Sequence, residues 1–112
     1  MAHQFSLRLY GISLETIRKL ARLLEEIARH DPDLARQLRR ALTSIQLNIA
    51  EGTESQGRLR VSRYRNALGS TNESIAGFEV AEALGYIRLA PDDLDALGLI
   101  RSTLLKLVMR KH

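Results

Sequence analysis

Apolar residues recur every three to four positions along most of this chain, and this period predicts helices rather than strands. The first clear stretch follows Ser13, a residue type that caps helix N-termini. Charged residues occupy the opposite face, and several form pairs of opposite sign four residues apart. We therefore expect an amphipathic helix from residue 13 to about residue 30. Its apolar face consists of Leu14, Ile17, Leu20, Ala21, Leu24, Ile27 and Ala28.

Turn-forming residues divide the rest of the chain into three further predicted helices. The pair Asp31-Pro32 is typical of a helix start, and Gly52 is a candidate for the glycine that follows a helix end. A third helix is expected from Arg58 or Val61 to Leu84, before Gly85, and a fourth over about 92–110. Short connections imply antiparallel neighbours, so the predicted fold class is all-α, an antiparallel up-down four-helix bundle.

The N-terminal segment has a different pattern. Residues 5–12, "FSLRLYGI", alternate like a strand, but the sequence offers no partner strand. We therefore predict an extended N-terminal arm over residues 1–12 and a four-helix bundle domain over residues 13–112.

Size and composition limit the class of protein. A chain of 112 residues fits one domain, and the absence of cysteine excludes disulfides, thiolate metal sites and cysteine nucleophiles. The sequence has no signal-peptide pattern and no apolar run long enough for a membrane span, so we expect a cytoplasmic location. The net charge of +4 permits binding to polyanions without demanding it.

The predicted third and fourth helices carry more apolar residues than one core-facing stripe requires. On the second helix, Leu47 falls among Arg36, Arg40 and Thr43, on the side that should face water. Large exposed apolar patches mark interaction sites, so we predict a homo-oligomer. The alternative is that the N-terminal arm and the 86–91 connection cover this surface. The predicted oligomer interface contains Leu47, Val80, Leu84, Leu99 and Leu107.

Asn48 lies at the margin of the apolar stripe of the second helix. A buried amide without hydrogen bonds costs about 1 to 3 kcal/mol, so it needs partners. We predict a structural polar network that fixes how the helices pack. Catalysis by the glutamates is the weakest interpretation, because no nucleophile or metal-ligand spacing accompanies them; we expect no enzyme activity, no metal and no cofactor. The predicted network consists of Arg39, Asn48, Glu51, Glu73 and Glu79.

Arginines are concentrated where the third helix is expected to begin. The helix macrodipole disfavours cations at that end by about 0.3 to 1 kcal/mol each, unless an anion offsets the effect. The partner could be a phosphate backbone or the acids of a neighbouring subunit, and a solvated surface without a nucleic-acid role is an equal alternative. The predicted nucleic-acid-binding residues are Arg36, Arg40, Arg58, Arg60, Arg63 and Arg65.

Two motifs support a family resemblance. The second predicted helix closes on Asn-Ile-Ala-Glu-Gly, residues 48–52, and the third contains Gly69, Ser70 and Glu73 before Leu-Gly-Tyr-Ile, residues 84–87. With these motifs the chain resembles the four-helix-bundle family first noticed in intervening sequences of 23S ribosomal RNA genes (S23-like). That family also includes the accessory variability determinant proteins of diversity-generating retroelements. Where the family commonly has proline, this chain has Gln46.

The resemblance implies a bundle that assembles into a homopentameric barrel and has no catalytic activity. It also implies partners, because the retroelement members bind nucleic acid and a reverse transcriptase. The function predicted from residues and resemblance together is a non-enzymatic homo-oligomer that binds RNA or DNA through phosphate contacts, as an accessory subunit to a reverse transcriptase. The alternative is a protein-protein interaction scaffold with no nucleic-acid role.

Overall fold

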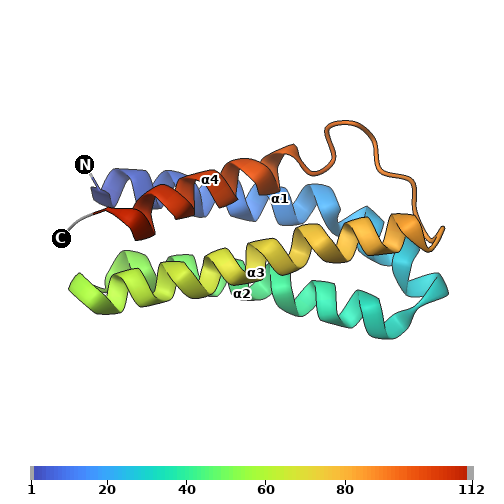
Figure 1. The fold of residues 1–112 in the computed structure, drawn as a ribbon, viewed down its shortest axis with the longest axis horizontal. Coiled ribbons are helices and arrows are strands. Elements are labelled where there is room, and N and C mark those ends of the chain that lie inside the picture. The colour runs from blue at the N-terminus through green and yellow to red at the C-terminus, as the bar shows by residue number, and fades with distance from the viewer. Residues whose placement is uncertain (1, 111–112) are drawn as a thin grey trace.

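The computed structural model describes residues 2–110, with side chains described from residue 7 onward. Within this range the chain forms four helices and no strand: α1 (Ala2–His30), α2 (Pro32–Glu54), α3 (Gly57–Ala83) and α4 (Asp95–Met109). The helices lie lengthwise in a body of 44 × 24 × 20 Å, with both chain ends at the same end of it (Figure 1). The all-helical prediction is confirmed. Among these residues, no helix is both long and apolar enough to cross a bilayer.

The extended N-terminal arm was a wrong prediction, because α1 is helical from Ala2. Met1 and the last two residues, 111–112, lie outside the described range. Leu9 is 2% exposed and Leu7 is 52% exposed, so the two leucines that suggested strand alternation point to opposite environments. Leu9, Ser13, Thr16 and Leu20 are all buried at spacings of three and four, and the helical period therefore extends toward the N-terminus.

The start of α2 forms as predicted, whereas its end does not. Asp31 Oδ1 accepts a hydrogen bond from the Leu34 amide at 3.0 Å, and Pro32 is the first helical residue. The helix continues through Gly52 to Glu54. A Cβ added to Gly52 would lie 2.4 Å from Cε1 of Tyr64, so this glycine lets the buried ring of α3 pack directly against the backbone of α2.

Arg60 explains part of the arginine concentration at the start of α3. Its Nε donates to the Gly52 carbonyl at 3.1 Å, and its Nη2 donates to the Thr53 carbonyl at 3.4 Å. These carbonyls belong to the last turn of α2, where cations are favourable because the C-terminal end of the macrodipole is negative. The residue therefore caps the preceding helix from its position on α3.

We expect Arg60→Ala to lower the free energy of unfolding by about 1 kcal/mol, because the last carbonyls of α2 lose a charged donor. Urea denaturation followed by circular dichroism measures this change. Arg88→Ala is the control, because Arg88 is exposed and the structure gives it no hydrogen bond or ion pair among the described residues. Equal stability of the two variants would contradict the capping role.

The core lies along the middle of the four helices. Ile27, Ile49, Phe78, Leu97 and Ile100 are fully buried, so every helix contributes to it. Leu107 is also buried at 8% exposure, and its assignment to an oligomer interface was therefore wrong. It continues the series Leu97, Ile100, Leu104 at spacings of three and four, and this places it on the core side of α4.

The fourth helix begins at Asp95, later than the predicted residue 92. Asp93 holds the preceding turn in place: its Oδ2 accepts from the Ala90 amide at 2.7 Å and its Oδ1 accepts from Nη2 of Arg22 at 2.6 Å. Glu82 Oε2 accepts from the Leu89 amide at 2.8 Å. The connection between α3 and α4 is thus fixed by side chains of both α1 and α3.

Candidate nucleic-acid interface

The outward side of α2 forms a shallow groove of about 570 Å³ with one side chain of α3. The groove brings together most of the polar residues that the sequence singled out on the second helix. Four of its residues are arginines, and one is a carboxylate. It is lined by Arg36, Arg39, Arg40, Thr43, Ser44, Leu47, Asn48 and Glu51 of α2 and by Arg63 of α3.

Two of the four arginines have carboxylate partners and two do not. Arg36 pairs with Asp33 one turn earlier. Nε of Arg63 lies 2.9 Å from Oε2 of Glu51, although its N–H is not directed to form a hydrogen bond. Arg39 and Arg40 are exposed, and the structure gives their guanidinium groups no hydrogen bond or ion pair among the described residues. The groove therefore keeps an excess of positive charge that its own residues do not neutralise.

Asn48 does not join the predicted network with α3 glutamates. Its Nδ2 donates to the Ser44 carbonyl at 2.9 Å and to Ser44 Oγ at 3.1 Å, both one turn earlier on the same helix. Ser70 Oγ then donates to Ser44 Oγ at 2.8 Å, and this contact links α2 to α3. Glu73 and Glu79 are exposed and have no partner among the described residues, so their place in a buried network was wrong.

The predicted arginine cluster at the start of α3 is divided among three places. Successive helical residues turn by about 100°, so four arginines at spacings of two and three cannot share one face. Arg63 lines the α2 groove, and Arg60 caps α2. Arg58 and Arg65 lie on the side of α3 that faces α4, beside Arg110.

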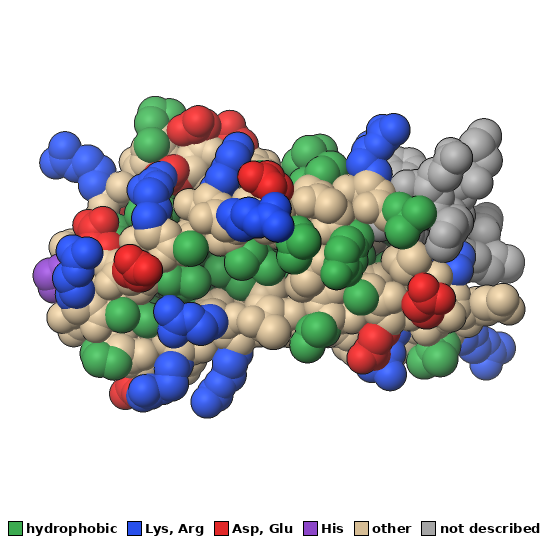
Figure 2. All heavy atoms as spheres, turned by 180° about the vertical axis from the view of Figure 1, so that it is seen from behind, with side chains coloured by type: hydrophobic (Ala, Val, Ile, Leu, Met, Phe, Trp, Pro, Cys, Tyr) green, Lys and Arg blue, Asp and Glu red, His purple; other side chains and the backbone are tan. Residues whose placement is uncertain are grey.

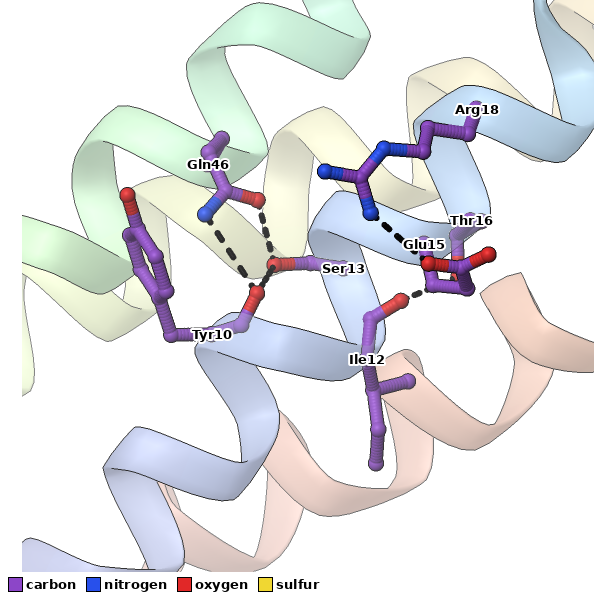
Figure 3. Close-up of polar contacts among 7 residues, drawn as sticks. All are labelled: Tyr10, Ile12, Ser13, Glu15, Thr16, Arg18 and Gln46. Carbon is purple, nitrogen blue, oxygen red and sulfur yellow. Dashed lines mark hydrogen bonds and ion pairs between the residues drawn. The ribbon is translucent and has the colours of Figure 1, made fainter.

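The sequence reasoning missed Gln46 as the buried amide of α2. Figure 3 shows its side chain pointing to α1, where Ser13 Oγ donates to Gln46 Oε1 at 2.5 Å. Gln46 Nε2 donates to the Tyr10 carbonyl at 3.4 Å, and Ser13 Oγ also lies 2.9 Å from that oxygen. A signal existed, because this residue is four positions after Leu42 and three before Ile49, both of which are buried.

Four of the five leucine and valine positions predicted for an interface are exposed. Their exposed fractions are 57% for Leu47 and Leu84, 53% for Leu99 and 47% for Val80. Figure 2 shows the face on which α1 and α2 lie, with Lys and Arg side chains on both sides of an apolar strip. The exposure of these side chains is confirmed, and their contact with another copy stays a prediction.

Comparison with known proteins agrees with the motifs. The family described as 23S rRNA-intervening sequence protein matches residues 5–100. The chain belongs to this family. A solved structure of the same fold is a protein with unknown function from the S23 ribosomal protein family of Bacteroides thetaiotaomicron VPI-5482. It aligns with a TM-score of 0.83 at 21% identity, over 95% of this chain and 99% of that one. No curated protein matches this chain.

The motif at residues 48–52 has two physical roles in this member of the family. Asn48 and Glu51 line the groove, whereas Ile49 is buried in the core and Gly52 lies against the ring of Tyr64. The same turn of helix thus packs α2 against α3 on one side and provides polar side chains to the groove on the other.

Proposed function

We propose that this protein is a non-enzymatic homo-oligomer that binds nucleic acid through phosphate contacts in the α2 groove. The observation that supports this most is the pair Arg39 and Arg40, two exposed guanidinium groups without carboxylate partners in a groove of four arginines and one glutamate. Guanidinium groups bind phosphate oxygens in a bidentate way, and this geometry suits them to a nucleic-acid backbone.

The composition of the groove favours backbone contacts over base recognition. None of its lining residues is aromatic, so it offers no platform on which bases could stack. Ser44 and Thr43 add short hydroxyl groups that can donate to phosphate oxygens. Affinity should therefore depend little on sequence and fall steeply as salt increases.

Self-association is the second part of the proposal. Leu47, Val80, Leu84 and Leu99 leave apolar surface exposed on three helices. The family resemblance suggests that the protomer, as an up-down bundle, assembles into a five-membered barrel. A ring would repeat the groove in every copy. The net charge of +4 per chain would then add over all copies and strengthen the positive electrostatic potential that attracts a polyanion. The same resemblance suggests a role as an accessory subunit to the reverse transcriptase of a diversity-generating retroelement, and the sequence pattern favours a cytoplasmic location.

The variant Arg39→Glu/Arg40→Glu tests the groove. We expect binding of a labelled single-stranded RNA to weaken at least tenfold at about 0.1 M salt, because two phosphate contacts are lost and two repulsive charges are added. The plot of log affinity against log salt should become shallower by about 1.4, at about 0.7 for each lost contact. Fluorescence anisotropy over a salt series measures both quantities.

The control Arg88→Glu/Arg101→Glu makes the same change in net charge at exposed positions outside the groove. Its affinity should stay within about threefold of the wild type, because screening limits distant charges to a small effect. Equal losses in both variants would mean that only net charge matters, and this result would remove the groove as the site.

Leu47 favours the alternative of a protein-interaction scaffold, because it is 57% exposed among the groove arginines. A leucine between guanidinium groups can bind an acidic, apolar protein segment as well as a phosphate backbone. Affinity purification with and without nuclease separates the two functions. A protein partner, such as a reverse transcriptase, that is retained after nuclease treatment would support the scaffold, and its release would support nucleic-acid binding.

A further inference from the structure

The α2 groove contains hydrogen-bond acceptors as well as cations, and a phosphate group has no use for an acceptor. Three of its four arginines lie in the first half of α2, at positions 36, 39 and 40. Asn48 and Glu51 lie further along the helix, and Asn48 is about 12 Å from Arg40 at a rise of about 1.5 Å per residue. A ligand that fills the whole groove must therefore offer anionic oxygens at one end and a hydrogen-bond donor at the other.

The orientation of the Asn48 amide is fixed by its own helix. A carbonyl oxygen only accepts hydrogen bonds, so the amide atom that lies 2.9 Å from the Ser44 carbonyl must be the nitrogen, Nδ2. The amide oxygen, Oδ1, then has no hydrogen bond among the residues that the structure describes. The side chain is half-buried, but Oδ1 itself is not enclosed. It is a free acceptor in the lining of the groove.

Ser44 provides a hydroxyl donor between the arginines and this acceptor. Its Oγ accepts from Asn48 Nδ2 at 3.1 Å and from Ser70 Oγ at 2.8 Å. A serine hydroxyl has two lone pairs and one hydrogen, so both lone pairs are occupied and the hydrogen remains for a ligand. The groups along α2 thus follow the order guanidinium, hydroxyl donor, amide acceptor.

Glu51 limits what can approach the amide oxygen. Its carboxylate lies one turn after Asn48 and 2.9 Å from Nε of Arg63, and its side chain is 55% exposed. A phosphate beside Asn48 Oδ1 would meet an acceptor and a nearby negative charge, both of which repel it. A neutral hydroxyl can donate to Oδ1 without this repulsion. In a nucleic-acid backbone, the sugar 2′-hydroxyl of RNA is such a group, and DNA lacks it.

We infer that Asn48 Oδ1 accepts a hydrogen bond from a ribose 2′-hydroxyl, so that the α2 groove binds RNA in preference to DNA. Phosphates and 2′-hydroxyls belong to the same backbone, so one strand can satisfy Arg39 and Arg40 at one end and Asn48 at the other. The base sequence is not read, because the contacts are to phosphate and sugar. This inference rests on the phosphate binding proposed above and names the class of nucleic acid.

Three short strands test the inference: an oligouridine RNA, its 2′-fluoro analogue and the matching 2′-deoxyuridine strand. The fluorine substituent keeps the sugar close to its RNA conformation but donates no hydrogen bond. The wild type should bind RNA about fivefold more tightly than the 2′-fluoro strand, as expected for one hydrogen bond, and DNA no more tightly than the 2′-fluoro strand. Asn48→Leu should weaken RNA binding to the level of the 2′-fluoro strand and leave binding of that strand unchanged. Fluorescence anisotropy at one salt concentration measures these affinities.

Thr43→Val is the matched control. Thr43 lines the same groove, and its hydroxyl already donates to the Arg39 carbonyl at 2.7 Å. The control should therefore keep the preference for RNA over the 2′-fluoro strand. Circular dichroism confirms that both variants are helical before their affinities are compared.

The outcomes separate this inference from the proposal on which it rests. Equal binding of RNA and the 2′-fluoro strand by the wild type would overturn the inference and leave phosphate binding standing. A preference that persists in Asn48→Leu, or that is lost equally in Thr43→Val, would also overturn it. Absence of binding to all three strands would remove both the inference and the proposed nucleic-acid function.

Discussion

Replacing Gly52 by leucine is expected to destabilise the protein by about 3 kcal/mol or more, because the position has no space for a side chain. Even a Cβ would lie 2.4 Å from Cε1 and 2.7 Å from Cδ1 of Tyr64. That ring is 2% exposed, so it cannot turn aside without displacing other core residues. The expected outcome is separation of α2 from α3 and a large loss in the free energy of unfolding, measured by urea denaturation.

Two other glycines provide the comparison. At Gly77 a Cβ would lie 2.4 Å from Cδ2 of Leu38, the flexible end of a side chain, so Gly77→Ala should cost less than the change at Gly52. At Gly98 a Cβ meets nothing within 4 Å, and Gly98→Ala should stabilise the protein by about 0.5 to 1 kcal/mol through helix propensity. If Gly52→Leu were as stable as Gly98→Ala, the close approach of α2 and α3 would be disproved.

Gln46→Leu is expected to lower the free energy of unfolding by about 1 kcal/mol. The substitution removes the buried hydrogen bond from Ser13 to α2, and such a bond contributes about 0.5 to 1.5 kcal/mol net. Ser13 Oγ keeps only its contact with the Tyr10 carbonyl on its own helix (Figure 3). The hydrogen bond that links α1 to α2 at this point is thereby removed.

The double variant Ser13→Ala/Gln46→Leu is the decisive comparison. Removing both polar groups should cost less than the sum of the two single losses, since each single variant already removes the same hydrogen bond. Chemical denaturation of the wild type, both single variants and the double variant gives the coupling energy between the two side chains. Additive losses in the double variant would mean that the hydrogen bond does not couple the helices.

Most of the fold could be predicted because helix signals are local. The pair Asp31-Pro32 and the 3.6-residue period predicted helices that the structure contains, with boundaries that shift by a few residues. The N-terminal arm failed because alternation over so short a stretch favours a strand by pattern alone, whereas in the helix that forms, Leu7 and Leu9 lie on opposite sides. Of these two leucines, Leu9 continues the buried series of α1, and this depends on a core that the sequence does not display.

The candidate site was predictable in composition but not in arrangement. Arg36, Arg40 and Asn48 share a groove because they belong to one helix, where spacing determines direction. The partners across helices could not be assigned, since they depend on how two helices meet. The structure pairs Glu51 with Arg63, and it brings Arg60 to the end of α2. Both pairings follow from the tight turn at residues 55–56, whose geometry single-residue patterns do not specify.

The connection from residue 84 to residue 94 also determines where the last helix lies. A groove of about 820 Å³ separates part of α4 from α1, and Arg22 with Asp93 crosses its margin. Near the far end of α1, the rings of His30 and Tyr86 stack at 5.3 Å between centroids. With the hydrogen bond from the Leu89 amide to Glu82, these contacts hold the connection at three points, and its length determines where α4 begins. An insertion or deletion in this connection would therefore change the position of α4 in the bundle, whereas a length change in an ordinary surface loop would not.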